Sequence, residues 1–188
     1  MGWEGAVGAK PPGVPRGGPA TPPAVDLSTN VGSVALPNPV MTASGTAGHG
    51  AELSRYLPLS DLGAVVVKSL SAAPHAGNPA PRLHPTAAGM LNSVGLQGPG
   101  VEAWLEHELP PLLASGARVV ASIWGLTVEE YAKAAAMLAD APAAVVAVEV
   151  NLSCPNVEER RRMFAHSASA AAEAVDATAG CRRPRWAK

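Results

Sequence analysis

The chain has 188 residues, 14 Lys and Arg against 15 Asp and Glu, a formal net charge of −1 and a hydrophobic content of 47%. This length is enough for one domain with a sizeable core, and the balanced charge gives no electrostatic basis for binding nucleic acid or an anionic membrane. No run of about 18 apolar residues occurs, and the first residues lack the order of a secretory signal, so we expect a cytoplasmic protein.

Residues 1–24 differ in composition from everything that follows. They contain six Gly and six Pro, and a segment that is half Gly and Pro does not form a packed element. We therefore predict a disordered extension over residues 1–24 and a folded domain over residues 25–188.

The folded part alternates predicted strands and helices. A small hairpin is expected over residues 27–36, and the further strands are expected over residues 39–43, 63–67, 118–123, 143–150 and 185–188. The helices are expected over residues 52–57, 102–113, 127–139 and 165–179. Pro110 and Pro111 are expected to end or kink the second helix, and Gly180 to stop the last one. Residues 70–100 are predicted to be irregular, a length that is more often functional than filler.

Repeated strand–helix units without a Gly-x-Gly-x-x-Gly motif favour a (β/α)₈ TIM barrel over a doubly wound sheet. A barrel of this kind takes about 250 residues, more than residues 25–188 supply. The sequence therefore predicts an α/β fold that corresponds to a barrel truncated after about its first half.

Polar residues follow the predicted strands at their carboxyl ends. They are Ser44, Lys68, Ser69, Ser122, Asn151, Cys154 and Lys188. Ligands of parallel α/β folds meet the protein at this end of the strands. A lysine at the tip of an apolar strand is desolvated, so Lys68 and Lys188 point to a bound anion. The alternatives are that Lys68 reaches solvent along the sheet edge and that Lys188, the terminal residue, lacks fixed surroundings.

The segment Asn151-Leu152-Ser153-Cys154-Pro155-Asn156 has the densest chemistry. Its carboxamides pair donors and acceptors for a flat, uncharged heterocycle, and its thiol can move a proton or attack carbon. The alternative is a Pro-Asn turn beside an inert cysteine. The five histidines lack metal-ligand spacing, so we expect them in loops or on the surface, and Cys181 is expected to be structural.

Five motifs in this order resemble class 1 dihydroorotate dehydrogenase, and within it the NAD-linked class 1B. The motifs are Met41-Thr42-Ala43-Ser44-Gly45, Val67-Lys68-Ser69, Gly77-Asn78-Pro79-Ala80-Pro81-Arg82, Asn92-Ser93-Val94-Gly95-Leu96 and Asn151-Leu152-Ser153-Cys154-Pro155-Asn156. The resemblance covers residues 25–188. It implies an FMN-containing barrel that oxidises dihydroorotate to orotate in de novo pyrimidine (UMP) biosynthesis.

The resemblance also implies roles for individual residues. Those implied to contact FMN are Ala43, Ser44, Lys68, Ser69, Ser122, Asn151 and Lys188. Those implied to hold dihydroorotate are Lys68, Asn92, Ser93, Val94, Gly95, Leu96, Asn151 and Asn156. Cys154 is implied to be the catalytic base that takes a proton from C5 while C6 delivers hydride to N5 of FMN.

Class 1B enzymes pair with an electron-transfer subunit that carries FAD and an iron–sulfur cluster, so the resemblance implies this partner and a homodimer or heterotetramer. Two other interpretations remain open. One is a related flavin barrel of the dihydropyrimidine dehydrogenase type. The other is an inactive half-barrel, since later strands of the family supply the FMN phosphate site.

Overall fold

The computed structural model describes residues 25–153, 155–156 and 162–188. The predicted extension at residues 1–24 and the thiol of Cys154 lie outside the described residues. The centre of the fold is a four-stranded sheet in the order β3, β6, β7, β10, and each neighbouring pair is parallel. The strands are β3 (Val65–Val66), β6 (Val119–Ile123), β7 (Val145–Val150) and β10 (Arg185–Ala187).

This sheet confirms the α/β prediction and four of the predicted strands, with shorter bounds. The four strands lie side by side in the order in which they occur along the chain, as strands do around a barrel wall. The strand expected over residues 39–43 is reduced to one parallel bridge between Met41 and Ala64. A similar bridge from Leu70 to Ile123 extends the β3–β6 contact towards the carboxyl ends.

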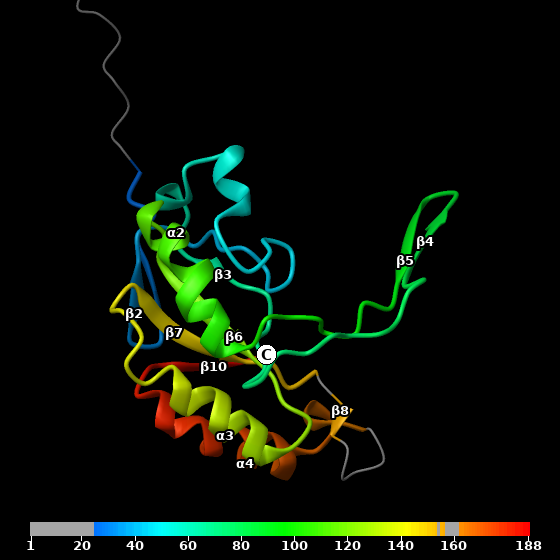
Figure 1. Cartoon of the computed structure of the whole chain (residues 1–188). Helices are drawn as coiled ribbons and strands as arrows, with labels where there is room; N and C mark the ends of the chain where they lie inside the picture. The colour runs from blue at the N-terminus through cyan, green and yellow to red at the C-terminus, as the bar shows by residue number, and fades with distance from the viewer. Residues whose placement is uncertain (1–24, 154, 157–161) are drawn as a thin grey trace, which may run out of the picture.

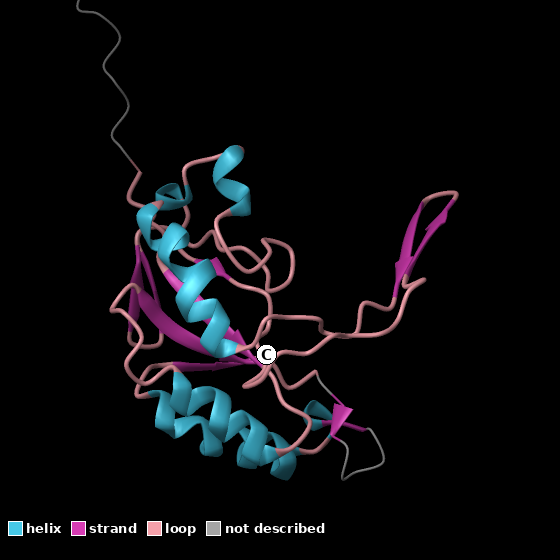
Figure 2. Ribbon diagram, viewed as in Figure 1, coloured by secondary structure: helices cyan, strands magenta, loops and turns pink. Residues whose placement is uncertain are grey.

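Helices cover one face of the sheet (Figures 1 and 2). They are α1 (Val101–Ala103), the π-helical segment η3 (Trp104–Glu108), α2 (Leu109–Ala114), α3 (Val128–Met137) and α4 (Ala168–Ala177). The short 3₁₀ segments are η1 (Glu52–Arg55), η2 (Leu59–Asp61), η4 (Phe164–His166) and η5 (Thr178–Cys181). Among the residues described, no helix is long and apolar enough to cross a membrane.

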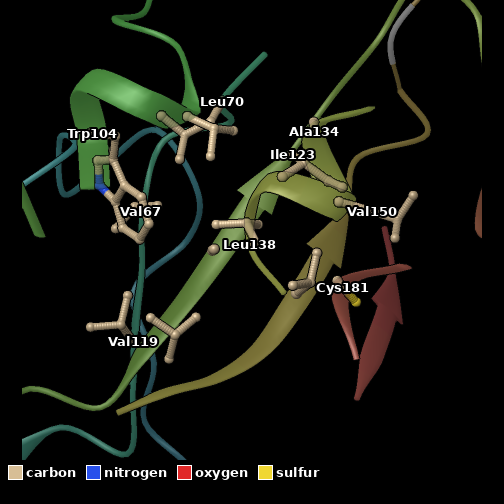
Figure 3. Close-up of a cluster of buried hydrophobic side chains, with 14 of the residues drawn as sticks. Val67, Leu70, Trp104, Val119, Ile123, Ala134, Leu138, Val150 and Cys181 are labelled. Carbon is tan, nitrogen blue, oxygen red and sulfur yellow. The ribbon is translucent and has the colours of Figure 1, made fainter. Parts of the chain in front are cut away.

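The main core lies between the sheet and these helices (Figure 3). Trp104 is fully buried, and its indole N–H donates to the backbone oxygen of His49 at 2.7 Å. Leu138 and Cys181 are buried in the same cluster. The structural role expected of Cys181 is therefore confirmed by its burial, and its Sγ lies 3.7 Å from the backbone oxygen of Arg183.

A hairpin packs on the other face of the sheet. It pairs β1 (Thr29–Val31) with β2 (Val34–Leu36), and it places Val34 and Leu36 against Val66, Val120 and Ala147. The predicted hairpin is confirmed, and its turn lies at residues 32–33, where Gly32 has a φ of +58°. This second apolar cluster covers the sheet up to Val120 and Ala147. The positions beyond it, at the carboxyl ends of the strands, are occupied by polar residues.

Two predictions about helix ends are wrong. Pro110 and Pro111 do not end the helix, because the chain stays helical to Ala114. The π-helical segment precedes the prolines, which occupy the first turn of α2, where a missing N–H is tolerated. Gly180 does not stop the last helix either: α4 ends at Ala177, and Arg182, with a φ of +54°, adopts the left-handed conformation.

The prediction that residues 70–100 are wholly irregular is also wrong. A second hairpin, β4 (Leu83–Thr86) with β5 (Gly89–Asn92), projects away from the body of the protein (Figure 1). All eight strand positions are exposed, so no alternation of buried and exposed residues marks these strands in the sequence. A third small pair joins β8 (Pro155–Asn156) to β9 (Arg162–Met163).

Candidate functional site

The site lies at the carboxyl ends of the parallel strands, on the face that carries the β1–β2 hairpin. Side chains alternate between the faces of a strand. Val120 and Ala147 pack against the hairpin, so Ser122 and Glu149, two residues further along, point to the same face beyond the apolar cluster. Strand register places Ser122 and Glu149 directly opposite each other.

Lys188 connects the last strand with the loop after the first predicted strand. Its Nζ donates to Ser44 Oγ at 2.6 Å and lies 3.4 Å from Glu149 Oε1. The Lys188 side chain is 43% exposed and that of Glu149 only 12%, so the ammonium group compensates a carboxylate that has little contact with solvent. The alternative that Lys188 lacks fixed surroundings is therefore not supported.

A chain of hydrogen bonds runs from Glu149 across the sheet. Ser122 Oγ donates to Glu149 Oε1 at 2.6 Å, Ser122 Oγ and Ser69 Oγ are 2.8 Å apart, and Asn151 Nδ2 donates to Ser69 Oγ at 3.0 Å. Ser69, Ser122 and Asn151 are all buried. Buried polar side chains that satisfy one another in this way hold a fixed arrangement.

Asn151 is anchored from several directions at once. Its Oδ1 accepts from the backbone N–H of Ser153 at 3.1 Å, and its own backbone oxygen accepts from the hydroxyl of Tyr131 at 2.6 Å. Tyr131 comes from α3, so this helix positions the chain where β7 ends. The side chain of Asn151 is thereby held at the centre of the network.

Five of the residues singled out in the sequence thus lie in one network, namely Ser44, Ser69, Ser122, Asn151 and Lys188. Glu149 belongs to it as well, and the sequence analysis missed it because it treated residues 143–150 as one apolar run. The signal was present: Glu149 is the only charged residue in β7, and it stands two positions before Asn151, which directly follows that strand.

Lys68 lies beside the network and lines a cavity of about 700 Å³ with His49, His75, Gln97 and Glu108. Its backbone N–H donates to Gly48 at 2.8 Å. Burial and, to a smaller extent, the nearby charge of Arg82 lower the pKa of Lys68. A desolvated ammonium group facing a cavity favours an anionic ligand there.

His49 lies in a loop, as the sequence predicted for the histidines. It is partly buried, and its Nε2 has no hydrogen-bond partner in the described part of the chain. Burial first, and the charge of Lys68 second, lower the pKa of His49, which favours the neutral ring. No three His, Cys, Asp or Glu among the described residues gather as a metal site requires.

The loop after Met41 brings backbone close to Lys68. Ala43 is exposed, and its oxygen accepts from the backbone N–H of Thr46 at 3.1 Å. Gly45 has a φ of +90°, and a Cβ built there would come no closer than 4.0 Å to Lys68 Cγ. The small residues of this loop therefore leave open space at Gly45 beside the aliphatic part of the Lys68 side chain.

The segment from Asn92 to Leu96 is not brought into this network. Asn92 ends β5, and with Ser93 it lines a shallow pocket on the projecting hairpin. Asn78 makes two hydrogen bonds to this segment: its Nδ2 donates to the Ser93 oxygen at 2.7 Å, and its backbone N–H donates to the Val94 oxygen at 3.0 Å. Gly95 and Leu96 follow with φ values of +73° and +57°. The substrate role of these residues stays a prediction.

Two further predicted residues cannot be compared with the structure. Cys154 lies outside the described residues, and of Asn156 only the backbone, in β8, is described. Both follow Asn151 within a few residues, so the anchored side chain of Asn151 fixes where this segment begins. Their roles stay predictions.

Comparison with known proteins agrees with the motifs. The family model described as "Dihydroorotate dehydrogenase" matches residues 26–184. The chain is 47% identical over 150 residues to the protein of Geobacter sp. (strain M21) named "Dihydroorotate dehydrogenase B (NAD(+)), catalytic subunit", covering 80% of this chain and 49% of the relative. Proteins of the same name from Geobacter sulfurreducens and Alkaliphilus metalliredigens are 45% identical over 152 residues and 47% identical over 134 residues. They cover 81% and 71% of this chain, and 50% and 44% of the relatives.

The chain therefore spans about half the length of the curated relatives that it matches. The family match includes the strands β3, β6 and β7 of the parallel sheet and ends just before β10. The strand-end residues of the network fall in the same range, apart from Lys188. On this evidence the chain belongs to the dihydroorotate dehydrogenase family.

Proposed function

We propose that this chain provides part of an FMN-dependent enzyme that oxidises dihydroorotate to orotate in de novo pyrimidine (UMP) biosynthesis, in the cytoplasm. The observation that carries the proposal is the single network of Ser44, Ser69, Ser122, Asn151 and Lys188 at the carboxyl ends of the strands. Family membership supports it. The parallel sheet then forms part of the wall of a (β/α)₈ barrel, whose ligands bind at this end.

The residues present fit a flavin. An isoalloxazine ring is flat and carries carbonyl oxygens and ring nitrogens along one edge, so it needs hydrogen-bond donors, a cation and a close approach of backbone. Asn151 and the buried serines offer the polar atoms, Lys188 and Lys68 offer the charge, and the open backbone at Gly45 offers the approach. We propose that FMN is held by Ala43, Ser44, Lys68, Ser69, Ser122, Asn151 and Lys188.

FMN, when bound, supplies the acceptor for the hydride that leaves C6 of dihydroorotate. The chain's own residues do the rest. Cys154 takes the proton from C5, so that two hydrogens leave the substrate and its ring gains a C5–C6 double bond. Lys68 pairs with the substrate carboxylate, and its charge also stabilises negative charge that develops beside it.

The remaining substrate contacts are carboxamides and backbone groups. We propose that Asn92, Asn151 and Asn156 satisfy the amide-like edge of the pyrimidine, and that Ser93, Val94, Gly95 and Leu96 complete the pocket. The segment from Asn92 to Leu96 follows the projecting hairpin β4–β5. Asn78 ties this segment to the exposed loop that leads into the hairpin. We propose that the loop and the segment come over the strand ends together when the substrate binds.

A partner subunit follows from the chemistry. The relatives are named as catalytic subunits of NAD(+)-linked enzymes, and the chain has only two cysteines, whereas an iron–sulfur cluster needs about four. We propose that electrons pass to a separate subunit with FAD and an iron–sulfur cluster in a heterotetramer; without that subunit, the enzyme forms a homodimer.

The test compares two substrates. We define the completed enzyme as this chain continued by the part of the Geobacter sp. relative that it does not match. Loaded with FMN and kept free of oxygen, it should lose its yellow colour with dihydroorotate and keep it with dihydrouracil. Loss of colour with dihydrouracil alone would instead identify an enzyme of the dihydropyrimidine dehydrogenase type, and loss with neither would reject the proposal.

A further inference from the structure

We propose that Glu149 is a positioning residue: its carboxylate sets the direction of the hydrogen bonds through Ser122 and Ser69, and so decides which way the carboxamide of Asn151 faces. None of the roles assigned above includes Glu149. The inference rests on the proposed function only for the identity of the ligand that Asn151 meets.

The direction follows from what each group is able to donate. An ionised carboxylate only accepts hydrogen bonds, so the hydroxyl of Ser122 has to donate to Glu149 Oε1, at 2.6 Å. Its single hydrogen is then used, and its oxygen accepts from the hydroxyl of Ser69, at 2.8 Å. The oxygen of Ser69 is left to accept from Asn151, whose Nδ2 lies 3.0 Å away.

The opposite end of the chain of hydrogen bonds requires the same orientation. The backbone N–H of Ser153 only donates, and it lies 3.1 Å from Asn151 Oδ1. The oxygen of the carboxamide therefore faces Ser153 and its nitrogen faces Ser69. A carboxamide rotated by half a turn would set donor against donor at Ser153, and acceptor against acceptor at Ser69, whose hydrogen is already donated to Ser122.

Burial makes a reversed direction of these hydrogen bonds unfavourable. Ser122 is fully buried, and Ser69 and Asn151 are only 4% and 6% exposed, so solvent does not supply substitute partners for a reversed chain. Lys188 Nζ, 3.4 Å from Glu149 Oε1, compensates the charge that the carboxylate brings into this region. The direction is thus fixed from both ends, by the acceptor-only carboxylate of Glu149 and by the donor-only backbone N–H of Ser153.

The consequence is a defined edge on Asn151. One Nδ2 hydrogen bonds Ser69 and Oδ1 bonds Ser153, which leaves one donor and one acceptor lone pair for a ligand, in a fixed order. A ligand that carries an acceptor and a donor in the complementary order is accepted, and one with the reverse order meets unpaired buried groups. Glu149 therefore acts on ligand selection through Asn151, without contact with the ligand.

The test uses the full chain without cofactor, labelled with ¹⁵N at asparagine, and observes the side-chain amide of Asn151 by NMR. The variant Asn151→Asp, which lacks that amide, identifies its signals. We expect one pair of signals in the unmodified chain. In Glu149→Gln the new carboxamide can donate to Ser122, so the chain of hydrogen bonds can reverse, and the single pair should shift or split into two.

Ser122→Ala removes the middle of the series but leaves Glu149 and Lys188 in place, and it should change the Asn151 signals in the same way. Glu149→Asp keeps an acceptor-only group and should retain a single pair. Glu173→Gln, on the exposed side of α4, is the matched control and should change nothing. The signals of Asn30 and Asn38 report in each sample that the fold is intact.

Two results would overturn the proposal. One is unchanged Asn151 signals in both Glu149→Gln and Ser122→Ala. The other is a change in Glu149→Gln without a change in Ser122→Ala, because the influence would then not run through the serines. If Glu149→Gln does not fold, Ser122→Ala alone decides. The NMR measurement uses no flavin and no substrate, so it remains valid even if the enzyme does not oxidise dihydroorotate. A failure of this proposal can therefore be distinguished from a failure of the proposed function.

Discussion

Lys188 Nζ donates a hydrogen bond of 2.6 Å to Ser44 Oγ across 144 residues of chain. The contact exists because β10 pairs in parallel with β7, which places Lys188 beside Glu149 at the end of the sheet. Two residues far apart in the chain are therefore joined at the carboxyl ends of the strands. Any change that detaches β10 removes a charged group from the site and leaves Glu149 without its partner.

Lys188 should contribute strongly to cofactor binding. Hydrogen bonds to charged groups contribute about 1.5–3 kcal/mol, and about 1.4 kcal/mol corresponds to tenfold in affinity. In the completed enzyme, Lys188→Gln should therefore raise the Kd for FMN about tenfold or more, measured by the quenching of flavin fluorescence. Lys133→Gln, on the exposed side of α3, should leave it unchanged; equal affinities for the two variants would remove Lys188 from the FMN site.

Cys154 should be needed for the chemical step but not for binding. A serine hydroxyl is far harder to deprotonate than a thiol, and a general base contributes about 10²–10⁴-fold to rate. Cys154→Ser in the completed enzyme should bind FMN normally and reduce it with dihydroorotate at least about 100-fold more slowly at neutral pH. Stopped-flow absorbance measures the rate, and an unchanged rate from acid to alkaline pH would exclude the thiol as base.

Lys68 should give the activity a pH dependence to which the charge of Arg82 contributes. Burial and, second, the charge of Arg82 lower the pKa of Lys68, so its ammonium form is lost at a lower pH than that of an ordinary lysine. Arg82→Gln removes the repulsion and raises the pKa of Lys68 towards its usual value. The alkaline fall of kcat/KM for dihydroorotate should then move to higher pH.

The control for this experiment keeps the charge. Arg82→Lys should retain the alkaline limb of the unmodified enzyme, because a lysine repels Lys68 as an arginine does. A limb that moves to lower pH in Arg82→Gln, or one that moves equally in both variants, would contradict the assigned cause. Lys68→Ala should lower kcat and raise KM together, since one charge serves both substrate and transition state.

The stability of the fold should depend on the helix-covered face of the sheet. Leu112 is fully buried in the main core, so Leu112→Ala should lower the free energy of unfolding by about 2–5 kcal/mol. Leu83, on the projecting hairpin, is 56% exposed, and Leu83→Ala should change it by less than about 0.5 kcal/mol. Urea denaturation followed by tryptophan fluorescence measures both, and equal losses would mean that the hairpin packs against the core.

The sequence predicted the buried strands because their physical signal is strong. Runs of Val and Ala buried on both faces, as in β6 and β7, are recognisable without knowledge of their partners. The carboxyl-end positions of Ser122 and Asn151 followed directly from those strand ends. Thus the part of the site that depends on strand boundaries could be predicted.

Features that depend on tertiary contacts could not be predicted from the sequence. The hairpin β4–β5 is exposed along its whole length, so its residues carry no burial pattern. The continuous helix through Pro110 depends on the preceding π-helical segment, which local preferences do not predict. Glu149 looked like an interruption of an apolar strand, and its role became visible only with Ser122 opposite it and Lys188 beside it.

The central claim is tested most directly by the product formed in a single turnover. The completed enzyme, loaded with FMN, free of oxygen and without an electron acceptor, is mixed with excess dihydroorotate, and the orotate produced is measured against the flavin present. The account predicts one orotate formed for each FMN reduced, with both lost in Cys154→Ser on the same timescale. Reduction of FMN without orotate, or no reduction in an enzyme that binds FMN, would contradict it.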